Sequence, residues 1–343
     1  MNEAFALGIG IGTKARDGRW LEVFFPAPLL HPDAALLAAV RSAVPQLQFA
    51  NLTVQPTLNQ WQALQRALSA WPEQAALATK FAAPSAQAVV TLLATDSALG
   101  STPETYLKLQ LLSHRLRLPN SMNLEGIFAT LPNVAWTSEG AIAADELPAR
   151  QLAARLAGRT LTVHGVDKFP RMTDYVVPPG VRIADASRVR LGAYLGNGTT
   201  VMHEGFINFN AGAVGPNMVE GRISQGVIVG AHSDLGGSSS TMGTLSGGGN
   251  IVISVGENCL IGANAGTGIP LGDRCTIEAG LYITAGPIVE VVDENATVVR
   301  TVKARELAGG SDCKFIRNSR TGRVECRTNR RAIELNDTLH AHN

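Results

Sequence analysis

An aliphatic residue recurs at every sixth position through the middle of the chain. A period of six fits neither a strand, whose side chains alternate with a period of two, nor a helix, whose period is 3.6. It predicts a triangular coil of parallel strands, in which each hexapeptide forms one flat side and its aliphatic residue points inward. Successive coils would stack at the usual strand spacing of about 4.8 Å. The recurring positions are Ile183, Val189, Leu195, Val201 and Ile207, then Ala213 and Val219, then Val229 and Leu235, then Val255 and Ile261, and finally Leu271, Ile277, Ile283 and Val289.

Two segments, 208–218 and 241–254, interrupt this repeat. We expect both to leave the coil as loops on one face, where functional sites tend to lie. The second segment contains Gly247, Gly248 and Gly249, which we interpret as a place where the backbone approaches a ligand rather than as a flexible tip. A β-sandwich of short strands is the competing hypothesis. It would show two-residue alternation with turns every 8–12 residues or so, and the sequence shows neither.

The first third of the chain predicts a mixed α/β domain. Before residue 160 it shows no metal-ligand spacing and no phosphate-binding loop, because Gly8, Gly10 and Gly12 lack the GxGxxG spacing of a dinucleotide loop. We therefore interpret this part as a packing or interface domain. The sequence predicts strands over 7–12, 21–25 and 160–164, helices over 32–44, 58–70 and 144–157, and a helix that begins at Ser101, Thr102, Pro103 and Glu104.

The repeat fades after Val289, so the sequence predicts three domains. An α/β N-terminal domain covers 1–165, the hexapeptide-repeat coil covers 166–295, and a small C-terminal β/α segment covers 296–343. The last segment is rich in Lys and Arg, which form either a solvated face or a site for a phosphate-bearing ligand. The elements predicted there are a strand over 296–303, a hairpin made of 314–319 and 322–328, and a short helix over 332–339.

Composition agrees with a coil and excludes several classes of protein. The 343-residue chain has 35 glycines, 23 of them between Gly180 and Gly286, whereas Phe, Trp and Tyr together make 5%. Small residues suit the corners of a coil, and an aliphatic interior explains the scarcity of aromatic rings. The hydrophobic fraction of 45% and the charged fraction of 17% exclude wholesale disorder. A net charge of 29 − 28 = +1 argues against a general nucleic-acid binder.

The sequence also bears on the compartment in which the protein works. No apolar run approaches the roughly 18 residues of a membrane helix. The N-terminal sequence MNEAFALGIGIG lacks the basic start of a signal peptide. The four cysteines show no CxxC spacing and no dense framework, which favours reduced thiols. We therefore expect a cytoplasmic protein.

Four stretches go beyond the general repeat: DKFPRMTDYVVPPGVRIADASRVRLGAYLGNGTTVMHEGFINFNAG, NMVEGRISQGVIVG, STMGTLSGGGNIVISVGENCLIGANAG and LGDRCTIEAGLYITAG. From Asp167 to the C-terminal ELNDTLHAHN, the chain resembles the tetrahydrodipicolinate N-succinyltransferase family, in its longer form with an enlarged N-terminal domain. The resemblance implies a left-handed parallel β-helix and a homotrimer with active sites in the grooves between neighbouring coils. It implies transfer of succinyl from succinyl-CoA to the amino group of ring-opened tetrahydrodipicolinate, which gives N-succinyl-2-amino-6-oxopimelate and CoA on the bacterial path to diaminopimelate and lysine.

Two glutamates compete for the role of catalytic carboxylate: Glu220 in VEGR and Glu204 in MHEG. An amine that attacks a thioester must lose a proton, so the site needs a base or an acyl-accepting carboxylate. By residue type alone, each glutamate could equally be an outward-facing acid of a coil. The resemblance implies that Glu220 is catalytic through a mixed anhydride, that Arg222 contacts succinyl-CoA, and that Glu204 helps to hold a magnesium ion near the trimer axis. Some relatives carry an Asp at the position of Ser187, for which Asp185 is only a loose substitute.

The resemblance also implies where the acyl-CoA donor binds. Backbone N–H groups should face the thioester oxygen, where negative charge develops. Small residues suit a narrow groove for the pantetheine arm, and Lys303 and Arg317 suit the nucleotide phosphates. Besides Arg222, the implied contacts are Gly237, Ser240, Ala263, Glu278, Ala279, Gly286, Lys303, Ile316, Arg317, Asn318 and Ser319.

Other chemistries have less support from the residues. His203 and His232 are the only histidines of the coil and do not supply the three imidazoles of a zinc hydratase, although His203 as a base stays open. Cys259 and Cys275 stand at positions that favour small core side chains, so we expect packing rather than a nucleophile. The competing functions are another acyl-CoA-dependent N- or O-acyltransferase of the hexapeptide-repeat group and, as a different class, a non-catalytic β-helix.

Overall fold

The computed structural model describes residues 3–48, 50–82, 87–243 and 251–328. Within these ranges the chain forms two compact units. The three-domain division of the sequence, with boundaries after residues 165 and 295, stays a prediction. The first unit comprises residues 1–111, 122–170 and 174–176, and the second comprises 112–121, 171–173 and 177–343.

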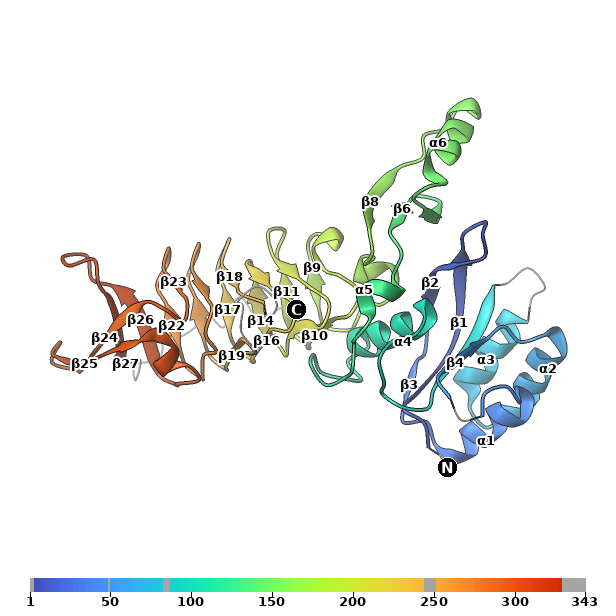
Figure 1. Ribbon diagram of the computed structural model, residues 1–343, viewed down its shortest axis with the longest axis horizontal. Coiled ribbons are helices and arrows are strands. Elements are labelled where there is room, and N and C mark those ends of the chain that lie inside the picture. Colours follow the sequence, from blue (N-terminus) through green and yellow to red (C-terminus); the bar gives the residue numbers. More distant parts are fainter. Residues whose placement is uncertain (1–2, 49, 83–86, 244–250, 329–343) are drawn as a thin grey trace. The chain divides into compact units, whose positions relative to one another are not determined.

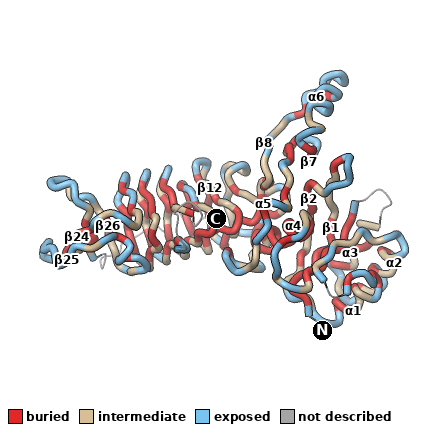
Figure 2. Tube along the Cα trace, viewed as in Figure 1, coloured by how far each residue is buried: buried red, intermediate tan, exposed pale blue. Residues whose placement is uncertain are grey.

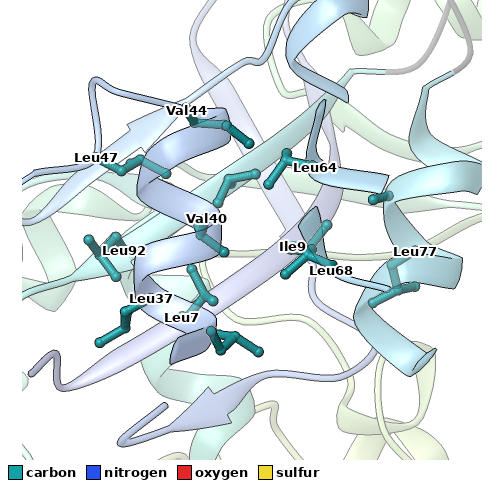
Figure 3. Close-up of a cluster of buried hydrophobic side chains, with 14 of the residues drawn as sticks. Leu7, Ile9, Leu37, Val40, Val44, Leu47, Leu64, Leu68, Leu77 and Leu92 are labelled. Atoms are coloured by element: carbon teal, nitrogen blue, oxygen red, sulfur yellow. The ribbon is translucent and has the colours of Figure 1, made fainter. Parts of the chain in front are cut away.

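The core of the first unit lies between an antiparallel sheet and three helices. The sheet has the order β2-β1-β5-β4, with β3 also paired to β1. Figure 3 shows Leu7 and Ile9 of the sheet facing Val40, Leu64 and Leu77 of the three helices, and all five side chains are buried. The elements are β1 (Ala6–Lys14), β2 (Trp20–Phe24), β3 (Leu29–Leu30), α1 (Ala34–Ala43), β4 (Leu52–Val54), α2 (Leu58–Ala67), α3 (Pro72–Phe81), β5 (Ala88–Leu93) and α4 (Thr102–Ser113).

Local signals set where the first helices begin. The Asp33 carboxylate accepts a hydrogen bond from Leu36 N at 2.8 Å, which caps α1. Thr57 and Gln60 form a capping box at the start of α2. The helices predicted over 32–44 and 58–70 are therefore confirmed, with bounds shifted by a few residues.

A second, three-stranded sheet completes the first unit in the order β7-β6-β8. The predicted helix over 144–157 is confirmed as α6, whereas the strand predicted over 160–164 lies three residues later as β8. The helix α3 and the strands β3, β4 and β5 were not predicted from the sequence. The elements here are α5 (Ile127–Thr130), β6 (Val134–Thr137), β7 (Gly140–Ala143), α6 (Leu147–Leu156) and β8 (Val163–Asp167).

One buried carboxyl in the first unit makes stability depend on pH. Glu22, on β2, is 9% exposed and accepts a hydrogen bond from Tyr175 Oη at 3.2 Å. Burial raises the pKa of the Glu22 carboxyl above its ordinary value of 4.5, although hydrogen bonds from Thr13 and Tyr175 oppose that rise. The folded chain thus keeps a proton that the unfolded chain releases. Stability is therefore expected to fall as pH rises from 4.5 through the folded-state pKa.

The Glu22→Gln variant tests this expectation. The amide keeps the shape and the contact with Tyr175 but cannot ionise, so the variant should lose this part of the fall in stability. Urea unfolding midpoints of wild type and variant, measured from pH 4.5 toward neutrality, should diverge as pH rises. Parallel pH profiles would show that Glu22 contributes nothing to the pH dependence.

The second unit is a stack of short parallel strands arranged as three faces (Figure 1). Face A is the parallel part of a ten-stranded sheet, face B a five-stranded sheet and face C a four-stranded sheet. The strands of face A are β9 (Arg182–Ile183), β11 (Thr199–Val201), β14 (Asn217–Val219), β17 (Asp234–Leu235), β20 (Leu260–Ile261), β22 (Thr276–Ile277) and β26 (Cys313–Arg317). Face B contains β12 (Phe206–Ile207), β15 (Arg222–Ile223), β18 (Ser240–Thr241), β21 (Gly266–Thr267) and β23 (Tyr282–Ile283). Face C contains β10 (Ala193–Leu195), β13 (Ala211–Ala213), β16 (Ile228–Val229) and β19 (Ser254–Val255).

The sixth-residue positions form the interior of this stack. Apart from Ile183, which is half-buried, every aliphatic residue of the predicted series is buried, as the red segments along the coils in Figure 2 illustrate. Residues of one face stack in register from coil to coil, so the predicted β-helix-type coil is confirmed. On face A the ladder runs Ile183, Val201, Val219, Leu235, Ile261, Ile277 and Phe315.

The interruptions of the repeat differ from those predicted. The segment 208–218 is not a loop: it contains β13 and most of β14, and the six-residue steps continue through it. The first irregular step runs from Val219 to Ile223 and spans four residues instead of six. A second four-residue step runs from Thr267 to Leu271. The segment 241–254, in contrast, does interrupt the repeat as predicted, because it adds extra residues between face B and face C.

The ladder predicts which side chains of one strand control stability. Ile261 is fully buried between Leu235 and Ile277, whereas Leu260, its neighbour on β20, points outward and is half-buried. Ile261→Ala should lower the free energy of unfolding by about 2–5 kcal/mol through lost burial and a cavity. Leu260→Ala is the matched control and should cost clearly less. Equal losses in chemical denaturation would contradict the inward assignment of the series.

The C-terminal part extends face A. The predicted hairpin is confirmed as the antiparallel pair β26–β27, and the predicted strand over 296–303 as β25. The predicted helix over 332–339 and the glycines 247–249 lie outside the described residues. No helix within the described ranges is both long enough and apolar enough to span a bilayer. The remaining elements are the short helices Met172–Asp174, Ala186–Arg188 and Ala304–Leu307 and the strands β24 (Ile288–Val292), β25 (Val298–Lys303) and β27 (Val324–Thr328).

Two cysteines stack inside the coil. Cys259 and Cys275 are fully buried free thiols on neighbouring coils, and Cys275 N donates to Cys259 Sγ at 3.2 Å. The hydrogen bond with Cys275, together with burial, raises the pKa of the Cys259 thiol. A thiol with a raised pKa is a poor nucleophile. The expectation that both side chains serve packing is confirmed.

Candidate functional site

Most of the candidate residues lie at one corner of the coil, where the chain passes from face A to face B. This corner column consists of residues 202–206, 220–222, 236–240, 262–266 and 278–282, one segment from each of five successive coils. Because the coils stack in parallel register, these segments lie one above the other. Members of the corner column are the candidates Glu204, Glu220, Arg222, Gly237, Ser240, Ala263, Glu278 and Ala279.

The two glutamates that competed as catalytic carboxylate face one point. A methyl group placed on Gly237 would lie 3.6 Å from Glu220 Oε2 and 3.7 Å from Glu204 Oε2. The two oxygens can therefore be no farther apart than the sum of these distances. Glu220 is half-buried and Glu204 is exposed. Since Gly237 has no side chain, it leaves open the space that both carboxylates border.

The four-residue step from Val219 to Ile223 sets the position of Glu220. Only Glu220, Gly221 and Arg222 turn this corner, whereas five residues turn it on the coil before. The turn is tight: a methyl group on Gly221 would lie 2.7 Å from Ser239 O, so only glycine fits. Glu220 N donates to Leu235 O at 2.9 Å, which ties its backbone to the next coil.

Arg222 is the second member, after Phe206, of a row of outward side chains on face B. Its Nε and Nη2 donate to Ser240 Oγ at 3.1 Å and 2.8 Å. The row continues through Gly266 to Tyr282, whose ring covers the space above Gly266. The sequence analysis missed Tyr282, which is 41% exposed. The sequence does indicate its orientation: Tyr282 directly precedes the inward-facing Ile283, so its ring points outward, beside the candidate residues.

The far end of the corner column joins the basic C-terminal hairpin. Glu278 Oε2 accepts a hydrogen bond from Arg317 N at 2.7 Å, so the structure brings together two of the candidates for donor binding. Gly286 and Lys303 lie at a different corner, between face B and β24, where Lys303 pairs with Ile288. Both are exposed, as is Arg317. Ile316, Asn318 and Ser319 flank Arg317 on and beyond β26.

The described residues of a single chain do not form a magnesium site. Glu204 offers one exposed carboxylate, while Asp185 accepts hydrogen bonds from Ser187 N at 2.8 Å and Ser187 Oγ at 2.7 Å. Across the described ranges, no three His, Cys, Asp or Glu side chains are grouped so that they could hold a metal ion. His203 and His232 are both exposed and do not join such a group. Mg²⁺ keeps several water ligands, but a single exposed carboxylate makes a weak site.

Comparison with known proteins identifies similar sequences over the full chain. Residues 131–171 match the family model described as tetrahydrodipicolinate N-succinyltransferase middle, and residues 252–285 match the hexapeptide repeat of succinyl-transferase. A 2,3,4,5-tetrahydropyridine-2,6-dicarboxylate N-succinyltransferase of Pseudomonas putida is 61% identical over 343 residues, which cover 100% of this chain and 99% of the relative. A Vibrio cholerae protein of the same name is 56% identical over 341 residues and covers 99% of each chain.

A solved structure has the same fold. It is a Campylobacter jejuni protein with the provisional description 2,3,4,5-tetrahydropyridine-2-carboxylate N-succinyltransferase. Its chain is 30% identical to the present one and superposes with a TM-score of 0.89. The match covers 96% of this chain and 93% of the other. The likeness therefore includes both units and not the repeat alone.

Proposed function

The chain belongs to the tetrahydropyridine-dicarboxylate N-succinyltransferase family, and we propose that the corner column is its acyl-transfer site. The protein is an acyltransferase that moves succinyl from succinyl-CoA to the amino group of ring-opened tetrahydrodipicolinate, a step of diaminopimelate and lysine biosynthesis. The names of the relatives support this activity. The alternative, a different acyl-CoA-dependent transferase, gains no support from them. The observation that carries the site assignment is the position of the Glu220 carboxylate beside the open space at Gly237, at the same corner of the coil as Arg222.

Glu220 is the catalytic carboxylate in this proposal. The acceptor amine must lose a proton when it attacks the thioester carbonyl, and an ionised Glu220 can take that proton or accept the acyl group itself. Either route leaves CoA as a thiol and the succinyl carbonyl bound to the acceptor nitrogen. Glu220 is preferred to the exposed Glu204 because it is half-buried and its backbone is fixed by the short corner.

Arg222 binds the carboxylate at the end of the succinyl group. Its guanidinium is exposed on face B, two residues beyond Glu220, so a bound acyl tail would bring the thioester near the catalytic carboxylate. In this proposal the rest of the donor follows the coils toward the basic C-terminal part. Arg317 on β26 meets the phosphates there, and Lys303 meets them from the corner between face B and β24. The donor contacts proposed along this path are Gly237, Ala263, Glu278, Ala279, Ile316, Asn318 and Ser319. Gly286 is proposed as a further contact at the corner where Lys303 lies.

The working form in this proposal is a homotrimer of left-handed coils. The corner column lies on the outside of a single coil, so a donor bound there needs a second wall, which a neighbouring chain would supply. Light scattering should give three times the mass of one chain for the active protein. A fully active monomer would contradict this arrangement.

Magnesium at Glu204 and a cytoplasmic location stay predictions. Among the residues that the structure describes, no group of three metal-ligating side chains includes Glu204, so a metal there would require carboxylates from three chains to converge. No step of the reaction proposed here goes through a metal.

Release of free thiol from the acyl-CoA donor tests the proposed function. A thiol-reactive dye should detect CoA only when tetrahydrodipicolinate is present, and succinyl-CoA should be used far faster than acetyl-CoA. Thiol release without the acceptor would indicate a thioesterase. A preference for acetyl-CoA would favour a different acyltransferase of the same repeat group.

A further inference from the structure

Ser240 lies where it can set the orientation of Arg222. The two residues pair directly across β15 and β18, and both side chains point outward on face B. Ser240 is 9% exposed, whereas Arg222 is exposed. A buried hydroxyl thus accepts hydrogen bonds from the Nε and Nη2 of an exposed guanidinium. Ser240 itself is fixed by the sheet, since its N–H donates to Ala265 O at 3.0 Å.

The Ser240 hydroxyl uses its acceptor capacity on Arg222. A serine hydroxyl has one donor hydrogen and two acceptor lone pairs. Both lone pairs face the two donors of Arg222, at 3.1 Å from Nε and 2.8 Å from Nη2. The Ser240 hydroxyl oxygen also lies 3.5 Å from Thr241 O, beyond the usual range of an O–H···O bond. Within the chain, its strong hydrogen-bond partner is therefore the Arg222 guanidinium.

The same contacts leave one edge of the guanidinium available. A guanidinium has five N–H donors in a rigid planar fork. Two of them meet Ser240, so the plane of the group is fixed. Two of the three remaining donors, one on Nη1 and one on Nη2, form the end-on edge, which matches a carboxylate in a two-bond arrangement.

We propose that Ser240 is a positioning residue that holds Arg222 in the orientation needed to bind an acyl-CoA with a terminal carboxylate. Through Arg222 it determines specificity for a dicarboxylic acyl group over an uncharged one of the same length. This role rests on the proposed function, which places the acyl carboxylate at Arg222. This role is indirect. Ser240 does not bind the donor itself, so its hydroxyl affects activity only when the Arg222 guanidinium is present.

A double-mutant cycle tests the proposal in the full-length protein. The donors are succinyl-CoA and butyryl-CoA, which has the same four-carbon chain without the carboxylate. Ser240→Ala should lower kcat/KM for succinyl-CoA about tenfold, since a misplaced binding group loses part of its effect on orientation, and should leave butyryl-CoA unchanged. In an Arg222→Ala background, Ser240→Ala should have no further effect on either donor.

Ser224→Ala is the matched control. The Ser224 hydroxyl donates to Thr241 O at 2.6 Å between the same two strands, so its removal costs a comparable structural bond without touching Arg222. It should not change the ratio of succinyl-CoA to butyryl-CoA activity. If Ser240→Ala slows both donors equally, or keeps its full effect without Arg222, then Ser240 contacts the donor or the fold directly and the proposal is wrong.

A measurement without turnover separates this proposal from the proposed function. Exchange of the Arg222 Nε–H with water, followed by NMR in the ligand-free protein, should be slow in wild type and in Ser224→Ala and faster in Ser240→Ala. Equal exchange in all three would overturn the positioning role whatever the enzyme catalyses. Wild type that transfers no succinyl would instead overturn the proposed function, and the exchange data would still decide whether Ser240 holds Arg222.

Discussion

Glu220→Gln is expected to lower turnover by about 10²-fold or more, the usual loss when an acid–base group is removed. The amide keeps the size and polarity of the side chain but can neither take the ammonium proton nor accept an acyl group. The aliphatic ladder is untouched, because the ladder residue at this corner is Val219. The melting temperature and the affinity for CoA should therefore stay close to those of wild type. Steady-state thiol release with saturating donor and acceptor measures the effect.

Glu204→Gln is the control for this experiment, because the two carboxylates border the same space beside Gly237. It removes an equal charge from the same corner of the preceding coil. The account expects a smaller fall in turnover than in Glu220→Gln. Near-normal turnover in Glu220→Gln together with an inactive Glu204→Gln would move the catalytic role to Glu204.

Arg222→Ala is expected to abolish the preference for a charged acyl tail. The kcat/KM for succinyl-CoA should fall roughly 10²-fold, because a charge-assisted pair of hydrogen bonds to the carboxylate is lost. The kcat/KM for butyryl-CoA should change much less, since that donor has no carboxylate to bind. The ratio of the two constants in one preparation measures the effect and is independent of the fraction of active protein.

Arg182→Ala serves as the matched control for Arg222→Ala. Arg182 is exposed on β9 of face A, so its removal changes the net charge equally but lies outside the corner column. It should leave the ratio of succinyl-CoA to butyryl-CoA unchanged. An equal loss with both donors in Arg222→Ala would assign Arg222 to the fold or to CoA itself.

The coil was predictable because its interior accepts only one kind of side chain. Each inward position, such as Val201 or Ile277, must fill a narrow prism between identical neighbours, and this requirement repeats an aliphatic residue along the sequence. The strand β5 was harder to see. All six of its residues are buried, so it lacks the alternation that marks a half-exposed strand.

The four-residue corner explains why the geometry of the site was not predicted. A strict six-residue spacing does not detect the four-residue step from Val219 to Ile223. It placed an interruption over 208–218 instead, just before that step. That step shortens one coil by two residues and brings Glu220 above Glu204 and beside Gly237. The sequence contained the signal, since Ile223 starts a second six-residue series through Val229 and Leu235.

The chemistry of a succinyl donor indicates residue types, whereas the assignment of those roles to Glu220 and Arg222 follows from the resemblance and stays a proposal. A carboxylate for the amine proton and an Arg for the acyl tail are general needs, and VEGR supplies both within three residues. The bond from Arg222 to Ser240 was not predictable, because the partners are 18 residues apart and meet only through the stacking of two coils.

The fate of an isotopically labelled succinyl group tests the central claim most directly. Wild-type protein is incubated with tetrahydrodipicolinate and succinyl-CoA that carries 13C in all four succinyl carbons, and the product is analysed by mass spectrometry and NMR. The account predicts an amino-oxopimelate whose nitrogen bears the labelled succinyl group as an amide, formed together with one CoA thiol for each product molecule. Label recovered as free succinate, or bound to any atom of the acceptor other than its amino nitrogen, would contradict it.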